Sequence, residues 1–377
     1  MLYTVPDYYK EFSCVADRCE DTCCAGWQII ADKKSLIKYR RTRGPYLKKI
    51  LKSINWFQGT FRQDKEKRCA FLNEDNLCDM YIHLGSSSLC RTCRLYPRHI
   101  EEFEGVREIS LSVSCPEVAR ILMNRIEPVT FLSVENEKEE EYESFDLFLY
   151  SVLLDARDVM IEILQNRSLP VDVRAGLVYG MGRDIQKRVE RGEIFACQDV
   201  LDKYKKDSAR QYVEKQINKN RQDRTSLFEF HQEQMENMHK LELLKEDWYV
   251  QLVETQNRLF DGGVEEYALL TKEFHRWIEE QEFPWEIQKE QLLVYFIFTY
   301  FCGAVYDERV LDKAQMAIIS VNILEDMIMA RWLRNEKQLD TEDVIELVYR
   351  YSREVEHSDI NLKKMEQMMP IGHGLYC

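Results

Sequence analysis

Residues 14–27 read CVADRCEDTCCAGW and place four cysteines within eleven residues. Five more follow before residue 116, so nine of the chain's 12 cysteines lie in its first third. The nine are Cys14, Cys19, Cys23, Cys24, Cys69, Cys78, Cys90, Cys93 and Cys115. Closely spaced pairs let one turn present two thiolates to one ion, which lowers the loop-closure entropy of assembling a metal site. We therefore predict that these nine cysteines bind metal.

The spacing does not identify the metal, because soft thiolates select zinc and iron-sulfur clusters alike. Cys69, Cys78, Cys90 and Cys93 alone would make a four-cysteine zinc site of the kind that folds a small domain. Nine cysteines exceed the four that one site uses. The excess allows a second site, or some cysteines that are buried as small hydrophobic residues.

The expected compartment favours metal binding over disulfides. The start of the chain, MLYTVPDYYKEF, lacks the basic and apolar regions of a signal peptide, so we expect a cytoplasmic protein. Cytosolic thiols are kept reduced, and clustered cysteines there usually bind metal or do redox chemistry. The longest apolar stretch, Leu292–Ala304, is shorter than the ~18 residues that a membrane span needs, so we predict no membrane partner.

Charge is divided unevenly along the chain. Residues 1–115 contain 19 Lys and Arg against 15 Asp and Glu, a net charge of +4, and the remaining residues carry −18. A strongly acidic body repels nucleic acid and suits a cationic partner, although acidity also serves solubility alone. We therefore expect a protein partner and no nucleic acid.

The chain divides at a run of glutamates. Residues 135–143 contain six glutamates and one lysine, and they predict an acidic linker between a cysteine-rich metal domain, 1–134, and an α-helical domain, 144–377. Apolar residues recur at spacings of three and four from Phe145 to Ile163, which predicts a long amphipathic helix, and similar stripes predict eight to ten helices in all.

The first third predicts short irregular elements. A helix should start at Asp32, strands should cover 56–61 and 106–113, a small hairpin should span 69–78, and a helix should open with Pro116 in its first turn. The predicted fold class is mainly α, with a small irregular α+β cysteine-rich metal-binding module packed against a C-terminal multi-helix bundle.

Eight runs of the chain form a recognisable set: Cys14–Trp27, Arg68–Leu72, Leu77–Cys78, Leu89–Arg98, Ser114–Pro116, Leu293–Phe301, Ala304–Asp307 and Tyr351–Asp359. Together they resemble the flagellin lysine N-methylase family, within a wider group of cysteine-rich proteins described as zinc or iron chelators. The resemblance spans nearly the whole chain. It implies a protein lysine N-methyltransferase that acts on flagellin or a similar protein and uses S-adenosylmethionine and a 4Fe-4S cluster.

Methylation of lysine requires a neutral amine, so a neighbouring group must lower the amine's pKa or take its proton. Tyr351, Glu354, Glu356 and His357 lie in one of the resembling runs, and we take Tyr351, Glu356 and His357 as the catalytic candidates. The alternative is that these side chains form a solvated helix face or local ion pairs.

Arg94, Tyr96 and Arg98 directly follow a cysteine pair and are the candidates for cofactor binding. A guanidinium at this position can neutralise thiolate charge or bind the carboxylate of the methyl donor. His83 and His99 are further possible metal ligands, although a lone histidine is more often a hydrogen-bonded surface group.

Two functions stay open at this point. The first is the methyltransferase, for which we expect a pocket between the cysteine module and the helical bundle. No glycine-rich turn between a strand and a helix is visible, so the donor does not bind in a Rossmann-type site. The alternative is a non-catalytic zinc- or iron-binding protein whose helices form an interaction scaffold, as in a redox or metal sensor.

Overall fold

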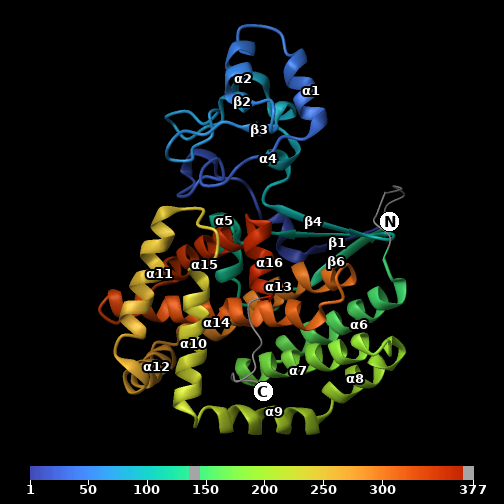
Figure 1. Ribbon diagram of the computed structural model, residues 1–377, viewed down its shortest axis with the longest axis vertical. Helices are drawn as coiled ribbons and strands as arrows, with labels where there is room; N and C mark the ends of the chain where they lie inside the picture. The colour runs from blue at the N-terminus through green and yellow to red at the C-terminus, as the bar shows by residue number, and fades with distance from the viewer. Residues whose placement is uncertain (136–144, 368–377) are drawn as a thin grey trace.

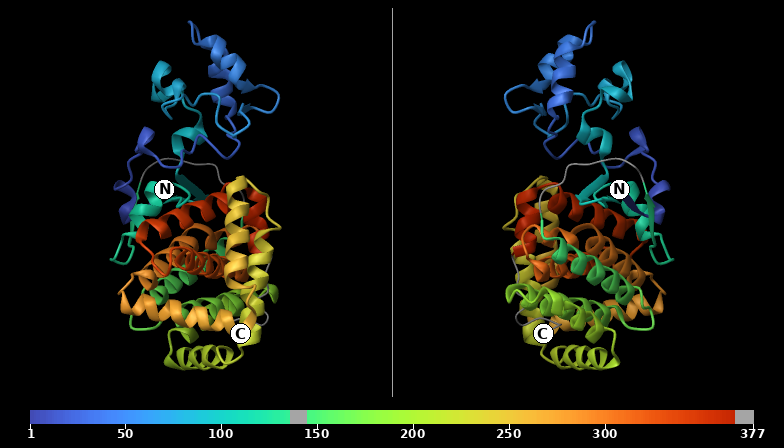
Figure 2. Two further views of the ribbon diagram at one scale, coloured as in Figure 1. Left: turned by 90° about the vertical axis from the view of Figure 1, so that its left-hand side faces the viewer. Right: turned by 90° about the vertical axis from the view of Figure 1, so that its right-hand side faces the viewer.

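The computed structural model describes residues 1–135 and 145–367. A small irregular module stands on a much larger body of helices, and a β-sheet lies where the two meet (Figure 1). The two side views show the same arrangement, with the module projecting from one end of the body (Figure 2). The predicted fold class, mainly α with a small α+β part, is confirmed.

The module consists of short helices and two-residue strands joined by irregular segments. Its elements are α1 (Lys33–Arg41), α2 (Leu47–Ser53), β2 (Ile54–Asn55), β3 (Thr60–Phe61), α3 (Asp79–Leu84) and α4 (Arg91–Leu95). The helix start predicted at Asp32 is confirmed, because its side chain accepts a hydrogen bond from the Ser35 amide at 2.9 Å and caps α1.

Two other local predictions for the module are only partly correct. Most of the strand predicted at 56–61 is a turn, because the Asn55 side-chain oxygen accepts a hydrogen bond from the Phe57 amide and bends the chain there. The hairpin predicted at 69–78 is reduced to a single antiparallel bridge between Leu72 and Cys78.

A four-stranded mixed sheet connects the module to the body. Its strand order is β4 (Arg98–Phe103), β5 (Val106–Leu111), β1 (Leu2–Pro6) and β6 (Phe131–Glu135). β1 runs parallel to β5, with Tyr3 opposite Arg107, and the other neighbouring pairs are antiparallel. The strand predicted at 106–113 is therefore present as β5, and the predicted helix is α5 (Pro116–Met123), with Pro116 in its first turn.

The described chain beyond residue 145 is helical. Its helices are α6 (Leu147–Leu164), α7 (Val171–Glu190), α8 (Cys197–Tyr204), α9 (Asp207–Asn220), α10 (Arg224–Met238), α11 (Glu246–Leu259), α12 (Gly263–Glu280), α13 (Trp285–Tyr300), α14 (Val310–Arg334), α15 (Thr341–Glu356) and α16 (Asp359–Gln367). These are eleven α-helices within the described part, one more than the upper limit of the eight to ten predicted. The predicted amphipathic helix is α6. Every residue of α13 except Glu286 and Ile287 is buried, so this helix lies inside the body.

Two separate hydrophobic cores hold the protein together. The smaller core lies in the module and includes Tyr39, Phe71 and Cys90. The larger core includes the body helices together with Tyr8 and Phe103, so the sheet shares the core of the body.

The domain limits 1–134 and 144–377 stay a prediction. Of the predicted acidic linker 135–143, only Glu135 belongs to the described residues, where it ends β6. No helix in 1–135 or 145–367 combines the length and apolar character that crossing a membrane requires.

Candidate functional site

The nine cysteines of the first third lie in two neighbouring sets. The module thiols are Cys24, Cys69, Cys78, Cys90 and Cys93, and the interface thiols are Cys14, Cys19, Cys23 and Cys115. Within each set the thiols are near enough for one to shift the ionisation of another, and a hydrogen bond between Cys23 and Cys24 connects the sets. All cysteines in the described part of the chain are free thiols. The fold therefore gathers residues that are far apart in sequence.

Hydrogen bonding and burial give these thiols different acidities. The hydrogen bond from Cys93 lowers the pKa of Cys90 to about 7, against the opposing effect of burial. Burial raises the pKa of Cys69 to about 12 and that of Cys115 to about 11. The Cys90 thiol therefore ionises much more readily near neutral pH than the Cys69 thiol does.

The type of donor atom favours a metal site, whereas the arrangement of the side chains does not. Clustered thiols are the ligands that zinc and iron-sulfur clusters use. However, no three His, Cys, Asp or Glu side chains within 1–135 and 145–367 are arranged so that they could hold a metal ion. The cysteines are gathered but do not converge on one centre, and their role as ligands stays a prediction.

Ion pairs connect the segment of the interface thiols to the helical body. The Asp21 carboxylate pairs with Arg353 of α15 and with Lys245, each at 2.7 Å. Arg353 Nε also donates a hydrogen bond to the Ser114 carbonyl oxygen at 2.8 Å. Because the Arg353 side chain is only 6% exposed, these contacts lie largely away from water and fix the module against α15.

A pocket of about 350 Å³ lies between the module and the body, where the methyltransferase hypothesis places one. Its lining residues are Trp27, Arg91, Thr92, Leu95, Tyr96, Pro97, Arg98, His99, Ile100, Ser112, Tyr300, Glu356 and His357. The start of β4 and the end of α15 meet here. Four of the six predicted catalytic and cofactor residues therefore come together: Tyr96, Arg98, Glu356 and His357.

Glu356 is the acidic residue of this pocket. Its Oε2 atom accepts hydrogen bonds from the hydroxyls of Tyr295 and Tyr300 on α13, each at 2.6 Å, and from Ser112 at 3.3 Å. Its Oε1 atom accepts a hydrogen bond from the Ser352 hydroxyl, one turn earlier in α15. Hydrogen bonds of this kind stabilise a carboxylate and fix its direction. The carboxylate is thus held rigidly at the wall of the pocket.

His357 caps the C-terminal end of α15 and lies between aromatic rings. Its ring centroid is 4.5 Å from that of Trp27, and its Nε2 atom is 2.9 Å from the Ser114 hydroxyl. Burial, with the positive charges of Arg353 and Lys245, lowers the pKa of His357 to about 3. The imidazole is therefore neutral near pH 7 and a weak base, so it is better suited to orient a neighbour than to carry a proton.

The three predicted cofactor residues have different positions. Tyr96 lines the pocket, and its hydroxyl is 3.2 Å from the Ser114 hydroxyl. Arg98 also lines it, and its Nε donates to the Tyr9 hydroxyl at 2.8 Å. Arg94 is exposed on α4 and does not line the pocket.

Tyr351 is not brought to the pocket either. Its side chain is fully buried, and its hydroxyl donates to the Ser320 hydroxyl on α14 at 2.9 Å. Five residues of an α-helix separate two side chains by about 140° around its axis, so Tyr351 and Glu356 face different neighbours.

Glu354, which lies in the same resembling run, is buried away from the pocket and accepts hydrogen bonds from the backbone amides of Leu244 and Lys245. Burial, against the effect of these hydrogen bonds, raises its pKa to about 7. This carboxyl group therefore holds the segment before α11 and does not face the pocket.

The sequence assigns no role in the pocket to two tyrosines of α13. Tyr300, which lines the pocket, and Tyr295, which binds Glu356 beside it, lie in the resembling run Leu293–Phe301, but their helix reads as hydrophobic core and nothing local pairs them with Glu356. His99 was considered only as a metal ligand. Burial opposes its protonation, but the charges of Glu101, at 2.8 Å, and Glu356 raise the pKa of His99. Of the two histidines that line the pocket, His99 thus favours the protonated form and His357 the neutral form.

Comparison with known proteins identifies the family of this chain. The FliB lysine N-methylase C-terminal domain matches residues 157–374, which include α13 and α15 with their pocket residues. The chain belongs to the FliB lysine N-methylase family. The resemblance expected from the sequence is thereby confirmed.

Individual members of this family match a shorter stretch. The flagellar biosynthetic protein FliU of Salmonella muenchen is 33% identical over 129 residues, which are 32% of this chain and 76% of FliU. The lysine-N-methylases of Salmonella typhimurium and Salmonella choleraesuis are also 33% identical over 129 residues, which are 32% of this chain and 32% of their own length. No solved structure matches the chain.

Proposed function

We propose that this protein is a cytoplasmic protein lysine N-methyltransferase that acts on flagellin or a similar protein. The observation that carries the proposal is the pocket between module and body, in which the Glu356 carboxylate is held by surrounding hydroxyls. Membership of the FliB lysine N-methylase family and the names of its similar members support the reaction type. The methyl donor we propose is S-adenosylmethionine.

The reaction is a displacement at the donor's methyl carbon. The neutral lysine nitrogen attacks that carbon, the carbon–sulfur bond breaks, a thioether leaves, and the nitrogen gives up a proton. We assign the proton to Glu356, because it is the only carboxylate among the lining residues within the described part of the chain. Trp27, Tyr96 and Tyr300 border the position of the amine, and aromatic faces attract a lysine cation as it enters.

Of the three residues that the sequence predicts to bind the cofactor, two line the pocket. Arg98 remains our candidate for the donor's carboxylate, since its guanidinium is held over the Tyr9 ring at 5.5 Å and borders the pocket. Tyr96 remains a lining residue whose ring lies 5.6 Å from that of His357. Arg94 has no place in this pocket.

We also retain the 4Fe-4S cluster as a proposal, with zinc as the alternative. The gathered thiols support it by donor type, and none of the steps above depends on it. Anaerobic purification followed by iron, sulfide and zinc analysis identifies the metal. Stoichiometric zinc without sulfide would remove the cluster from the proposal.

The function is tested by incubating the anaerobically purified protein with flagellin and labelled S-adenosylmethionine. The expected result is label on flagellin lysines. An intact metal centre with no label on lysine would favour the alternative, a metal-binding protein with a helical interaction scaffold.

A further inference from the structure

The basic end of the module has no role in the mechanism above. Residues 33–63 contain ten Lys and Arg and no Asp or Glu, in a chain whose net charge is −14. Like charges repel one another, so a run of this kind raises the local positive potential unless an anionic partner covers it.

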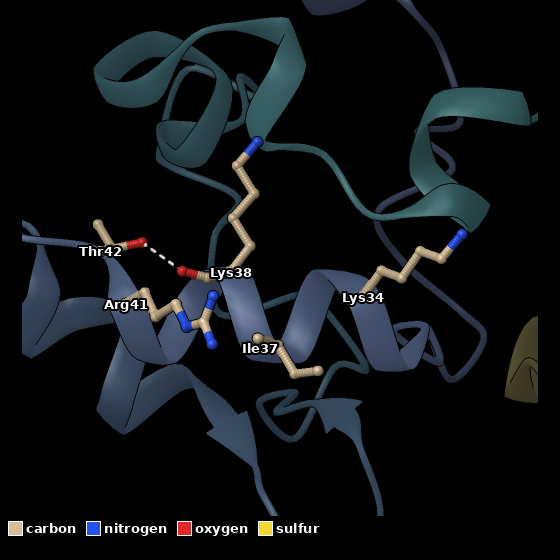
Figure 3. A pocket seen from close by; sticks show the side chains of 5 residues that line it. All are labelled: Lys34, Ile37, Lys38, Arg41 and Thr42. Carbon is tan, nitrogen blue, oxygen red and sulfur yellow. Dashed lines mark hydrogen bonds between the residues drawn. The ribbon is translucent and has the colours of Figure 1, made fainter.

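An open hollow of about 540 Å³ lies on α1 within this basic stretch (Figure 3). We call it the α1 hollow, and its lining residues are Lys34, Ile37, Lys38, Arg41 and Thr42. Figure 3 shows four of these side chains on α1 and that of Thr42 just beyond its end, with Ile37 between Lys34 and Arg41. The hollow thus offers three cations and an exposed aliphatic side chain, and Ile37 is 51% exposed.

The cations of the α1 hollow are largely unneutralised. Lys38 donates a hydrogen bond to the Ser87 carbonyl oxygen, which fixes its direction but leaves its charge uncompensated. Lys34 and Arg41 form no ion pair with any residue of 1–135 or 145–367. By contrast, Lys49 on α2 is paired with Asp79 at 2.5 Å. Positive charge is therefore available for a partner at the hollow.

The start of α1, next to the hollow, is joined to a wall of the pocket by two hydrogen bonds. The Asp32 side chain at the start of α1 accepts a hydrogen bond from the Arg91 amide at 2.8 Å, and the Thr92 hydroxyl donates to the Ile30 carbonyl oxygen at 2.9 Å. Arg91 and Thr92 also line the pocket. The start of α1, which carries the hollow, therefore lies against the segment that forms one wall of the pocket.

We propose that the α1 hollow binds an acidic segment of the protein whose lysine enters the pocket. Carboxylates fit the cations, an apolar side chain fits against Ile37, and Arg41 can bind a carboxylate through two parallel hydrogen bonds. The phosphates of a nucleic acid would meet the cations but place no apolar side chain against Ile37, so an acidic peptide segment fits the hollow better. This inference rests on the proposed function and adds to it the chemistry of the substrate beyond its lysine.

The binding test uses a fluorescein-labelled polyglutamate peptide and fluorescence anisotropy on the intact protein. Lys34→Glu/Arg41→Glu should weaken binding about tenfold at low salt, with a smaller difference at high salt. Lys48→Glu/Lys52→Glu on α2 makes the same change of charge on exposed residues outside the hollow, and it should change affinity less than about twofold. Circular dichroism melts confirm that each variant is folded.

Equal losses in both variants, or no binding by the wild type, would overturn the inference. Another ligand would also overturn it. This would be the result if the wild type bound phosphatidylserine vesicles or duplex DNA but not polyglutamate, and if Lys34→Glu/Arg41→Glu abolished that binding.

Kinetics with flagellin separate this inference from the proposed function. Lys34→Glu/Arg41→Glu should raise KM for flagellin about tenfold and leave kcat unchanged, because neither residue lines the pocket. If flagellin is methylated with an unchanged KM, the α1 hollow is not its docking site and the function stands. If the wild type transfers no methyl group, the function fails and the peptide experiment still decides what the hollow binds.

Discussion

Replacing Glu356 by glutamine removes one negative charge from the pocket and keeps the shape of the side chain. The carboxylate accepts two short hydrogen bonds, from Tyr295 and Tyr300, and two more from serine hydroxyls. A hydrogen bond to a charged group contributes about 1.5–3 kcal/mol and a neutral one about 1 kcal/mol, so weakening the two tyrosine bonds should cost about 2 kcal/mol of unfolding free energy. Loss of the proton acceptor should lower kcat by about 10²–10⁴-fold.

The assay is single-turnover transfer of label from S-adenosylmethionine to flagellin, with urea denaturation of the same protein samples. The matched control is Tyr351→Phe, which removes the hydrogen bond to Ser320 in the core and leaves the pocket unchanged. It should lose about 1 kcal/mol of stability and keep its rate. A Glu356→Gln enzyme that transfers methyl groups within about threefold of the wild-type rate would refute the assignment of the proton to Glu356.

Three further predictions concern Arg353, Glu354 and Gly26, which lie at or next to the contact between module and body. Arg353→Met should lower the unfolding free energy by about 3 kcal/mol, because Asp21 keeps a mostly buried charge with one partner fewer; an unchanged urea midpoint would contradict this. Burial raises the pKa of Glu354 from 4.5 to about 7, so the folded protein binds this proton more tightly than the unfolded chain does. The contribution of Glu354 to stability should therefore be greatest below pH 4.5 and fall by on the order of 3 kcal/mol as the pH rises to 7, so the difference in unfolding free energy between the wild type and Glu354→Gln should change by that amount; parallel stability curves would disprove the point. Gly26→Ala should cost about 1–2 kcal/mol in a thermal melt, because φ is +91° and the new Cβ would lie 2.7 Å from Lys245 Cε; a melt like that of the wild type would show that the loop adapts.

Local features were predictable from sequence because local physics determines them. The capping side chain of Asp32 and the ring of Pro116 define helix starts through their own backbone geometry. The apolar stripe from residue 145 to 163 likewise defines α6. At 56–61 the same reasoning failed, because aromatic content favoured a strand while the Asn55 side chain formed a turn.

The pocket depends on packing between distant segments, which no local pattern contains. Trp27, Tyr96, Tyr300 and Glu356 belong to four separate segments that meet only after the module packs on the body. Sequence proximity also misled: Tyr351 lies near Glu356 in the chain, but helix geometry turns it into the core. Cysteine spacing predicted that thiols gather, and it does not define which of them bind a common ion.

The central claim is that lysines of a protein substrate receive methyl groups in the pocket at Glu356. Its most direct test is mass spectrometry of flagellin after incubation with the anaerobically purified protein and deuterated S-adenosylmethionine. The account predicts deuterated methyl groups on lysine with the wild type and almost none with Glu356→Gln. Flagellin that stays unlabelled with a wild-type protein that retains its metal would contradict it.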